Sequence, residues 1–138
     1  MKKFLERTAT EFGGRDGEVK DTQSRYSVKL SKPLEMGGVD PKGTNPEELF
    51  SIGYSSCFAS SLEYLLVANK VSYESLCVKA DTALMMDETT GFEFQLTVKV
   101  KIKGVSKKVE KEYTEKAYGF CPYSKAIKGN VKVTFIES

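Results

Sequence analysis

Two cysteines in contrasting settings are the residues of this chain best suited to chemistry. Cys57 lies within the apolar stretch GTNPEELFSIGYSSCFASSLEYLL, and Cys121 lies much later, in GFCPYS. The chain has no histidine, and its three cysteines form no CxxC pair, so the sequence disfavours a metal site. Core packing, a structural disulfide and thiol redox chemistry remain as interpretations.

The surroundings of each thiol predict a different reactivity. Burial raises the pKa of a thiol, so the apolar neighbours of Cys57 by themselves favour an inert core cysteine. Cys121 follows the end of a predicted helix and precedes a proline, where we expect a more accessible thiol. Cys77 falls on the polar face of a predicted strand, and we expect it to have no role.

Length and charge exclude several classes of protein. The 138 residues fit one domain, 1–138, with one core. A net charge of +2 is too balanced to indicate a nucleic-acid partner. Nothing resembles a signal peptide, and no apolar run reaches the roughly 20 residues of a membrane span. We therefore expect a cytoplasmic protein without membrane contact, where a static disulfide framework is disfavoured.

Alternating apolar and polar residues predict the strands. The clearest alternation is FEFQLTVKVKIK, whose apolar residues form one face and whose charged residues form the other. Glycine-containing turns are expected at 13–17 and 87–91, and a loop at 35–46. The predicted strands cover residues 4–12, 25–31, 75–86, 92–103 and 130–137. A polar face on a strand of this kind is typical of antiparallel sheets.

Two helices complete the predicted fold. The first runs from about 46 to 69, with Asn45 as its N-cap and Glu48 three residues later, as in a capping box. It has so few polar positions that we expect it to be buried in a core or an oligomer interface. The second covers 106–120. Paired strands with segregated helices give an α+β fold.

Three segments of the chain form a recognisable set. FGGRDG covers 12–17, GTNPEELFSIGYSSCF covers 43–58, and CPYSKAIKGNVKV covers 121–133. In this order they resemble the signature stretches of the organic hydroperoxide resistance (Ohr) family, within the wider OsmC-like group. The resemblance spans nearly the whole chain. It departs from the family at Lys128, where arginine is common, and at 39–42, where a more glycine-rich loop is usual.

The resemblance implies a fold and an activity. The fold would have antiparallel sheets wrapped around a buried central helix in an intertwined homodimer. The activity would be a thiol peroxidase that reduces organic hydroperoxides to alcohols. By the family motifs, Cys57 would be the peroxidatic cysteine, Cys121 the resolving cysteine, and Arg15 and Glu47 the catalytic ion pair. Glu48 is the rival of Glu47, but its spacing from the N-cap already gives it a capping role.

The physical chemistry of these side chains fits the implied roles. A guanidinium at Arg15 would stabilise the thiolate of Cys57, and Glu47 would orient it in a bidentate pair. Attack on a hydroperoxide would give a sulfenic acid at Cys57, which Cys121 would convert to a disulfide. The resemblance implies no bound cofactor, and re-reduction by an external dithiol such as a dihydrolipoamide-bearing protein. Apolar side chains expected to favour alkyl or lipid hydroperoxides are Phe50, Tyr54, Phe58 and Phe120.

One geometric conflict follows from the helix prediction. Glu47 and Cys57 lie ten residues apart, which on a straight helix is roughly 15 Å of rise and roughly 80° of rotation. One arginine could hardly contact both. Either the helix breaks near Gly53, or the site combines residues of two chains, which we favour. We also expect the loop containing Arg15 to move during turnover.

Three alternative functions stay open from the sequence. One is a relative of the same fold with another thiol reaction or a different oxidant. Another is a non-catalytic small-molecule or lipid-binding module whose cysteines only pack. The third is a redox sensor that binds a partner.

Overall fold

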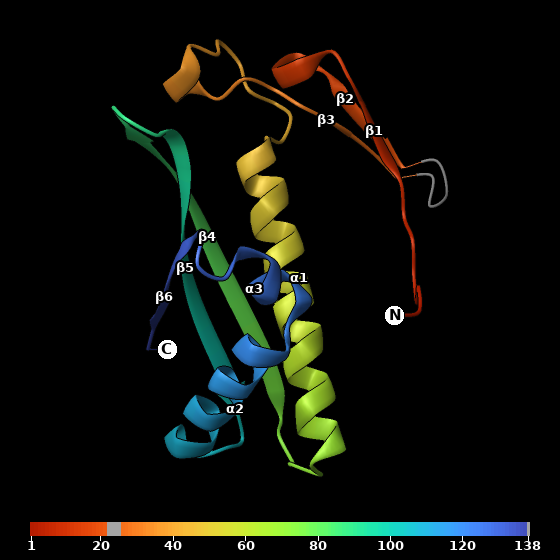
Figure 1. The fold of residues 1–138 in the computed structure, drawn as a ribbon, viewed down its shortest axis with the longest axis vertical. Coiled ribbons are helices and arrows are strands. Elements are labelled where there is room, and N and C mark those ends of the chain that lie inside the picture. Colours follow the sequence, from red (N-terminus) through yellow and green to blue (C-terminus); the bar gives the residue numbers. More distant parts are fainter. Residues whose placement is uncertain (22–25, 138) are drawn as a thin grey trace. The chain divides into compact units, whose positions relative to one another are not determined.

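The computed structural model describes residues 1–21 and 26–137, and the chain divides into two compact units. The first unit is Met1–Leu49 and the second is Phe50–Ser138 (Figure 1). The longest helix, α1 (Pro46–Ala68), begins in the first unit and continues into the second. None of the helices in the described ranges is long and apolar enough to cross a membrane. The prediction of a single domain over 1–138 stays a prediction.

The first unit contains a small antiparallel sheet. Its strands are β1 (Ala9–Phe12), β2 (Glu18–Asp21) and β3 (Ser27–Lys29), in that order. The predicted strand at 4–12 is thus shorter than expected. Strand β2 was not predicted, because EVKD contains a single apolar residue and shows no alternation. It is held instead by backbone pairing to a neighbour on each side. The start of the predicted strand 25–31, Arg25, lies outside the described residues.

Backbone hydrogen bonds tie the start of α1 to the first unit. The Thr44 N–H donates to the Lys29 carbonyl (2.9 Å), and the Ser31 N–H donates to the Thr44 carbonyl (2.9 Å). Asn45 caps the helix as predicted, since its Oδ1 accepts from the Glu48 N–H at 2.8 Å. The loop that precedes it contains one short 3-10 turn, η2 (Leu34–Met36).

The second unit contains a second three-stranded sheet. Strands β4 (Ser75–Asp87) and β5 (Gly91–Lys103) form a long antiparallel hairpin, as predicted. Strand β6 (Lys132–Ile136) pairs with β5 in parallel, so the expectation of purely antiparallel sheets is wrong for this pair. The reason is the crossover: α2 (Lys107–Phe120) and α3 (Pro122–Ile127) return the chain to the start of β5.

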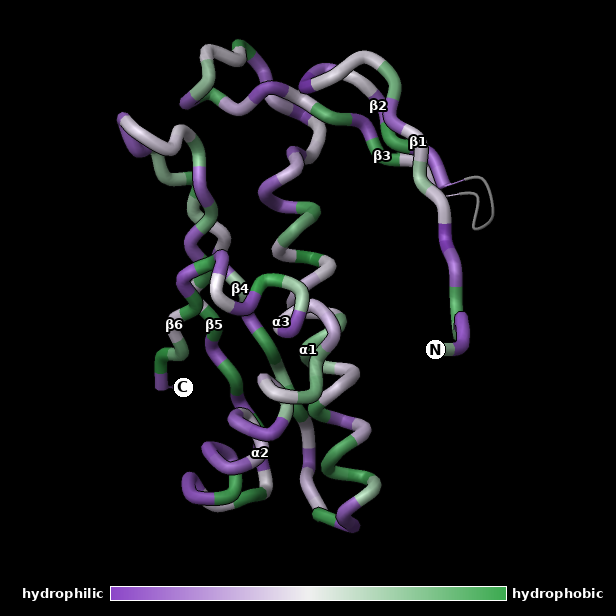
Figure 2. The backbone as a smooth tube through the Cα atoms, in the orientation of Figure 1, coloured by the Kyte–Doolittle hydropathy of each residue, from purple (hydrophilic) through white to green (hydrophobic). Residues whose placement is uncertain are grey.

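The hydrophobic core of the second unit lies between α1, β5 and α2. Hydrophobic segments recur along α1 and along the β4–β5 hairpin in Figure 2. Three apolar residues of α1 are instead more than half exposed in the single chain, namely Ile52, Tyr64 and Val67. The core residues are Tyr54, Phe58, Leu62 and Leu66 of α1, Leu96, Val98, Val100 and Ile102 of β5, Tyr113 and Ala117 of α2, and Cys121. Cys121 is therefore a core residue, although the sequence suggested an accessible loop thiol.

Candidate active site

Arg15 and Glu47 form a two-pronged ion pair within the first unit. The Arg15 Nη1 donates to Glu47 Oε2 at 3.0 Å, and Nη2 donates to Oε1 at 2.8 Å. The Glu47 side chain is 15% exposed and that of Arg15 is 34% exposed, so the pair is partly accessible to solvent. Glu48, the rival carboxylate, accepts instead from the Thr44 hydroxyl at 2.8 Å. The structure thus brings together the two residues that the motifs suggested, while their catalytic role stays a prediction.

The turn around Arg15 is fixed by its backbone. Arg15 lies in a short 3-10 helix, η1 (Gly14–Asp16), which is preceded by Gly13 in the left-handed region at φ +97°. Only glycine adopts this conformation at low cost, and the turn predicted at 13–17 is confirmed. The Asp16 carboxylate accepts the Lys32 N–H at 2.8 Å. The guanidinium is therefore carried by a turn that is anchored on the neighbouring loop.

The ion pair alters the pKa of both members in the direction that keeps them charged. The hydrogen bonds from Arg15 lower the pKa of Glu47, against a smaller opposing effect of burial. The hydrogen bond to Glu47 likewise raises the pKa of Arg15. At neutral pH both members are charged, and the Arg15 guanidinium is oriented by its two hydrogen bonds to the Glu47 carboxylate.

Cys57 and Cys121 lie side by side within the second unit. Their sulfur atoms are 3.6 Å apart, and both thiols are free. Cys57 is half-buried on α1, whereas Cys121 is fully buried between α2 and α3. A disulfide would need the sulfurs only about 1.5 Å closer. This proximity of residues far apart in the sequence is what a two-thiol redox reaction requires.

Gly53 allows this close approach. A Cβ atom on Gly53 would lie 2.9 Å from the ring of Tyr123, closer than ordinary packing permits. The missing side chain lets Tyr123 lie against α1 one turn before Cys57. The helix does not break near Gly53, because α1 is continuous from Pro46 to Ala68.

The two thiols differ in acidity. Burial raises the pKa of Cys57, and the Tyr123 N–H only partly offsets it. Burial also acts to raise the pKa of Cys121, but the backbone and hydroxyl of Ser124, with Cys57 and Tyr123, favour the thiolate and lower its pKa on balance. Among the described residues of the second unit, the groups acting on Cys57 do not offset the effect of burial on its pKa.

A buried hydroxyl pair next to the thiols was missed by sequence reasoning. The Tyr54 hydroxyl and the Ser124 hydroxyl lie 2.8 Å apart, and both residues are almost fully buried. Burial raises the pKa of Tyr54 to about 12, so its hydroxyl stays protonated. The sequence carried one signal for this site. Ser124 lies three residues after Cys121, which is the spacing between an N-cap residue and the third residue of a helix.

The four predicted pocket residues have different environments. Tyr54 and Phe58 are 0% exposed and belong to the core. Phe50 is partly buried and packs against Phe94, with ring centroids 5.1 Å apart. Phe120 is 43% exposed and stacks on Tyr64 at 5.3 Å. Of the four, Phe50 and Phe120 therefore keep exposed surface in the single chain, and a substrate-binding role for any of the four stays a prediction.

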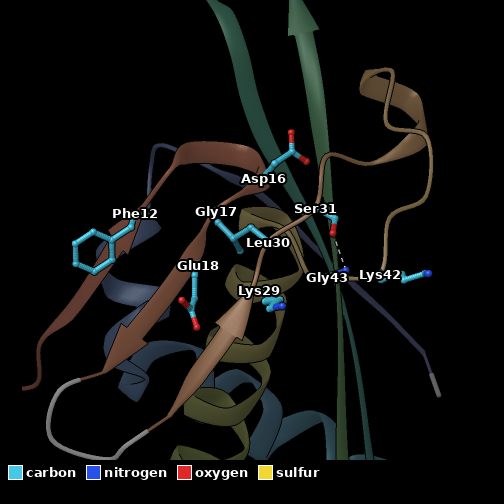
Figure 3. Close-up of a pocket in the computed structure, with 9 residues that line it drawn as sticks. All are labelled: Phe12, Asp16, Gly17, Glu18, Lys29, Leu30, Ser31, Lys42 and Gly43. Carbon is cyan, nitrogen blue, oxygen red and sulfur yellow. Dashed lines mark hydrogen bonds between the residues drawn. The ribbon is translucent and has the colours of Figure 1, made fainter.

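A separate hollow lies entirely in the first unit. It is bordered by β2, β3 and the loop before α1, with Leu30 in its lining and the Gly43 N–H donating to Ser31 Oγ at 2.7 Å (Figure 3). None of the four motif residues Arg15, Glu47, Cys57 and Cys121 is among its lining residues. In the described ranges, no group of three metal-ligating side chains could hold an ion.

Fold and thiol pair together define the class: an α+β protein with two adjacent thiols, one of them on its longest helix. The chain belongs to the OsmC-like protein family, whose model matches residues 39–136. Among curated proteins, an organic hydroperoxide resistance protein-like 2 from Staphylococcus epidermidis is 41% identical over 88% of this chain and 86% of its own. The organic hydroperoxide resistance protein OhrA of Bacillus subtilis is 36% identical over 92% of this chain and 91% of its own.

Solved structures of the same group match the whole chain. An organic hydroperoxide resistance protein from Legionella pneumophila superposes with a TM-score of 0.94 at 33% identity, covering 99% of both chains. One from Elizabethkingia anophelis also reaches 0.94 at 33% identity, covering 100% of this chain and 99% of its own. The resemblance stated from the three sequence motifs is confirmed.

Proposed function

We propose that the protein is a thiol-dependent peroxidase that reduces organic hydroperoxides to alcohols. The Cys57 thiolate attacks the distal oxygen of the hydroperoxide, the O–O bond breaks, and an alkoxide leaves and takes up a proton. Cys57 is oxidised to a sulfenic acid. Cys121 then attacks the Cys57 sulfur, a disulfide forms, and hydroxide leaves as water after gaining the proton of Cys121. An external dithiol reduces the disulfide and becomes oxidised itself.

The sulfur–sulfur distance of 3.6 Å is the observation that supports this proposal most directly. A resolving thiol this close captures a sulfenic acid before further peroxide can overoxidise it. The names of the relatives support organic hydroperoxides as the substrate class. Exposed apolar surface at Phe120 fits an alkyl or lipid chain better than hydrogen peroxide. A dihydrolipoamide-type dithiol in a reducing cytoplasm would complete the cycle.

The ion pair would supply what the thiol pair lacks. Burial raises the pKa of Cys57, so a cation must approach the sulfur for a thiolate to exist at neutral pH. Arg15, oriented by Glu47, would be that cation and would also stabilise the alkoxide that leaves.

We propose further that the two pairs meet across a homodimer. Because α1 is unbroken, Glu47 and Cys57 of one chain stay about 15 Å apart along the helix axis. A second copy could bring its own Arg15–Glu47 pair to the thiols. The exposed apolar residues of α1, Ile52, Tyr64 and Val67, are suited to such an interface.

The chemistry is tested by mass spectrometry after one equivalent of tert-butyl hydroperoxide. The wild-type protein should give a Cys57–Cys121 crosslinked peptide. Cys121→Ser should give a Cys57 sulfenic acid that dimedone traps, and Cys77→Ser should behave as wild type. Unmodified Cys57 in every sample would reject the peroxidase and favour a binding module. Oxidation without repeated turnover when a dithiol is supplied would favour a redox sensor.

The assembly is tested by mixing inactive subunits. Cys57→Ser keeps Arg15, and Arg15→Ala keeps Cys57. If each site combines the two chains, random mixing should restore about a quarter of the wild-type activity, because half the dimers are mixed and each has one complete site. Sites built within one chain would restore none. A fully active monomer in solution would also reject the shared site.

A further inference from the structure

We infer that Cys121 determines which thiols can re-reduce the protein. It is the leaving sulfur when an external thiol attacks the Cys57 sulfur of the disulfide, and its return to that sulfur rejects monothiols. This rests on the proposed function, in which the Cys57–Cys121 disulfide is the product of each turnover. Both effects belong to the reductive half of the cycle, after the alcohol has left.

The two sulfurs differ in their access to solvent. Cys57 is half-buried on α1, whereas Cys121 is 0% exposed. In thiol–disulfide exchange the attacking thiolate approaches along the S–S axis, from the side opposite the sulfur that leaves. Attack on Cys121 would bring the external thiol through the core of the second unit, which also contains Tyr113 and Ala117 of α2. Attack on Cys57 uses the sulfur that the hydroperoxide must also reach.

The backbone holds Cys121 in this buried position. Its N–H donates to the Ala117 carbonyl at 2.8 Å, at the end of α2, and its carbonyl accepts the Lys125 N–H at 3.0 Å, at the start of α3. A residue shared by the ends of two helices cannot move to the surface unless one of these bonds breaks. Because closing the disulfide moves the sulfurs by only about 1.5 Å, Cys121 stays buried in the oxidised protein.

The exchange therefore has one direction. The external thiolate forms a bond to the Cys57 sulfur, the S–S bond breaks, and the electron pair leaves with Cys121 as a thiolate. Burial acts on both thiols and raises the pKa of Cys57, but for Cys121 neighbouring hydrogen bonds outweigh burial and lower the pKa. The thiolate of lower pKa leaves faster, so acidity and access favour the same direction.

The closeness of Cys121 to Cys57 is the reason that monothiols are rejected. The two sulfurs are 3.6 Å apart in the reduced protein, so the Cys121 thiolate lies next to the mixed disulfide that it has just left. It attacks Cys57 again, re-forms the disulfide and expels the monothiol unchanged. A second monothiol from solution must compete with this neighbour, whose effective concentration is far higher.

A dithiol escapes this return. Its second thiol attacks its own sulfur in the mixed disulfide, closes a ring and releases Cys57 as a thiolate. The dithiol is then oxidised to a cyclic disulfide, and both cysteines are reduced. This step is also intramolecular, so it competes with the return of Cys121 on equal terms.

The site of attack is tested on a disulfide that is made without a hydroperoxide. Cys77→Ser leaves Cys57 and Cys121 as the remaining cysteines, and diamide oxidises them to the disulfide. The protein is treated with excess mercaptoethanol, quenched with N-ethylmaleimide in denaturant and mapped by mass spectrometry. Mercaptoethanol should be found on Cys57 and maleimide on Cys121. Mercaptoethanol on Cys121, or equally on both residues, would overturn the inference.

The rejection of monothiols is tested by turnover with matched reductants. Mercaptoethanol should support turnover of tert-butyl hydroperoxide by the wild type about a hundredfold more slowly than dithiothreitol at equal thiol concentration. Cys121→Ser removes the returning thiolate, so the two rates should become similar in that variant. Cys77→Ser is the control and should keep the wild-type ratio. An unchanged ratio in a Cys121→Ser protein with a native circular dichroism spectrum would overturn the role of Cys121 in selection.

The two measurements also separate this inference from the peroxidase proposal. The mapping uses diamide, so its result does not depend on any reaction with a hydroperoxide. Mercaptoethanol on Cys57 in a protein that never turns over hydroperoxide would support the direction of exchange and reject the peroxidase.

Discussion

The ion pair of the first unit and the thiol pair of the second differ in almost every physical respect. Arg15 and Glu47 are charged, partly exposed and joined by two hydrogen bonds of 2.8 and 3.0 Å. Cys57 and Cys121 are free cysteines, one half-buried and one fully buried, and joined by a single weak contact of 3.6 Å. Charge stabilises the first pair, whereas packing holds the second.

The difference shows that neither region suffices for the proposed chemistry. The thiol region provides proximity and a dry environment, but its burial raises the pKa of Cys57. The ion-pair region provides an oriented cation but no cysteine among its described residues. Peroxidase activity would need the Arg15 guanidinium of one region at the Cys57 thiol of the other. The following predictions test whether both regions are required.

The largest effect is expected from Cys57→Ser. A serine hydroxyl is far less acidic and less nucleophilic than a thiol, so peroxidase turnover should fall to the uncatalysed background. The measurement is consumption of tert-butyl hydroperoxide with excess dithiol. Cys77→Ser, which removes an exposed thiol, is the control and should keep full activity. Comparable activity in the two variants would remove Cys57 from the mechanism.

Arg15→Ala should come next. Loss of the guanidinium should lower kcat/KM by about a hundredfold, the usual scale for one electrostatic stabiliser, and should shift the pH profile for alkylation of Cys57 upward. Arg15→Lys should recover little, because an ammonium cannot form the two-pronged pair with Glu47. The control is Arg7→Ala, an exposed arginine that donates to the neighbouring Glu6 carbonyl. An unchanged pH profile for alkylation of Cys57 in Arg15→Ala would show that the guanidinium does not act on this thiol.

Glu47→Gln should have a smaller effect than loss of the arginine. The guanidinium remains but loses its orientation, so kcat/KM should fall about tenfold. Glu48→Gln provides a matched control one residue away, since that carboxylate accepts from Thr44. Equal losses of kcat/KM in Glu47→Gln and Glu48→Gln would show that activity depends on the start of α1 and not on the ion pair.

Gly53→Ala tests whether disulfide formation in the thiol region depends on the close approach of Tyr123 to α1. The new methyl would meet the Tyr123 ring, while alanine favours a helix over glycine by about 1 kcal/mol. The two effects should nearly cancel in the free energy of unfolding, measured with urea, while disulfide formation slows about threefold as α3 is displaced. Gly119→Ala on α2, where a Cβ has open space, is the control. Identical disulfide rates would show that Tyr123 need not lie against α1.

The smallest effect is the pH dependence of the ion pair. The pKa of Glu47 is lowered in the folded protein, so the pair contributes stability above pH 4.5, the ordinary value, and loses it as pH falls through the lower folded value. Wild type should therefore lose more stability than Glu47→Gln between pH 5 and about 3. If the free energies of unfolding of the two proteins, measured with urea, changed equally across this pH range, the ion pair would add nothing to the stability of the fold.

Local sequence determined much of this protein. The alternation of FEFQLTVKVKIK predicted β5, and Asn45 with Pro46 predicted the start of α1, because periodicity and capping are local properties. The three motifs also predicted the family. The short strand β2 escaped prediction because its pairing is supplied by neighbours and not by its own side chains.

Only the tertiary structure decided how distant residues meet. The parallel pairing of β6, the two-pronged contact between Arg15 and Glu47, and the contact between Tyr54 and Ser124 all join residues that the sequence separates widely. The same holds for acidity: the sequence could indicate two cysteines, but burial and hydrogen bonding set the pKa of each. These quantities depend on the full three-dimensional environment of an atom, which local periodicity does not encode.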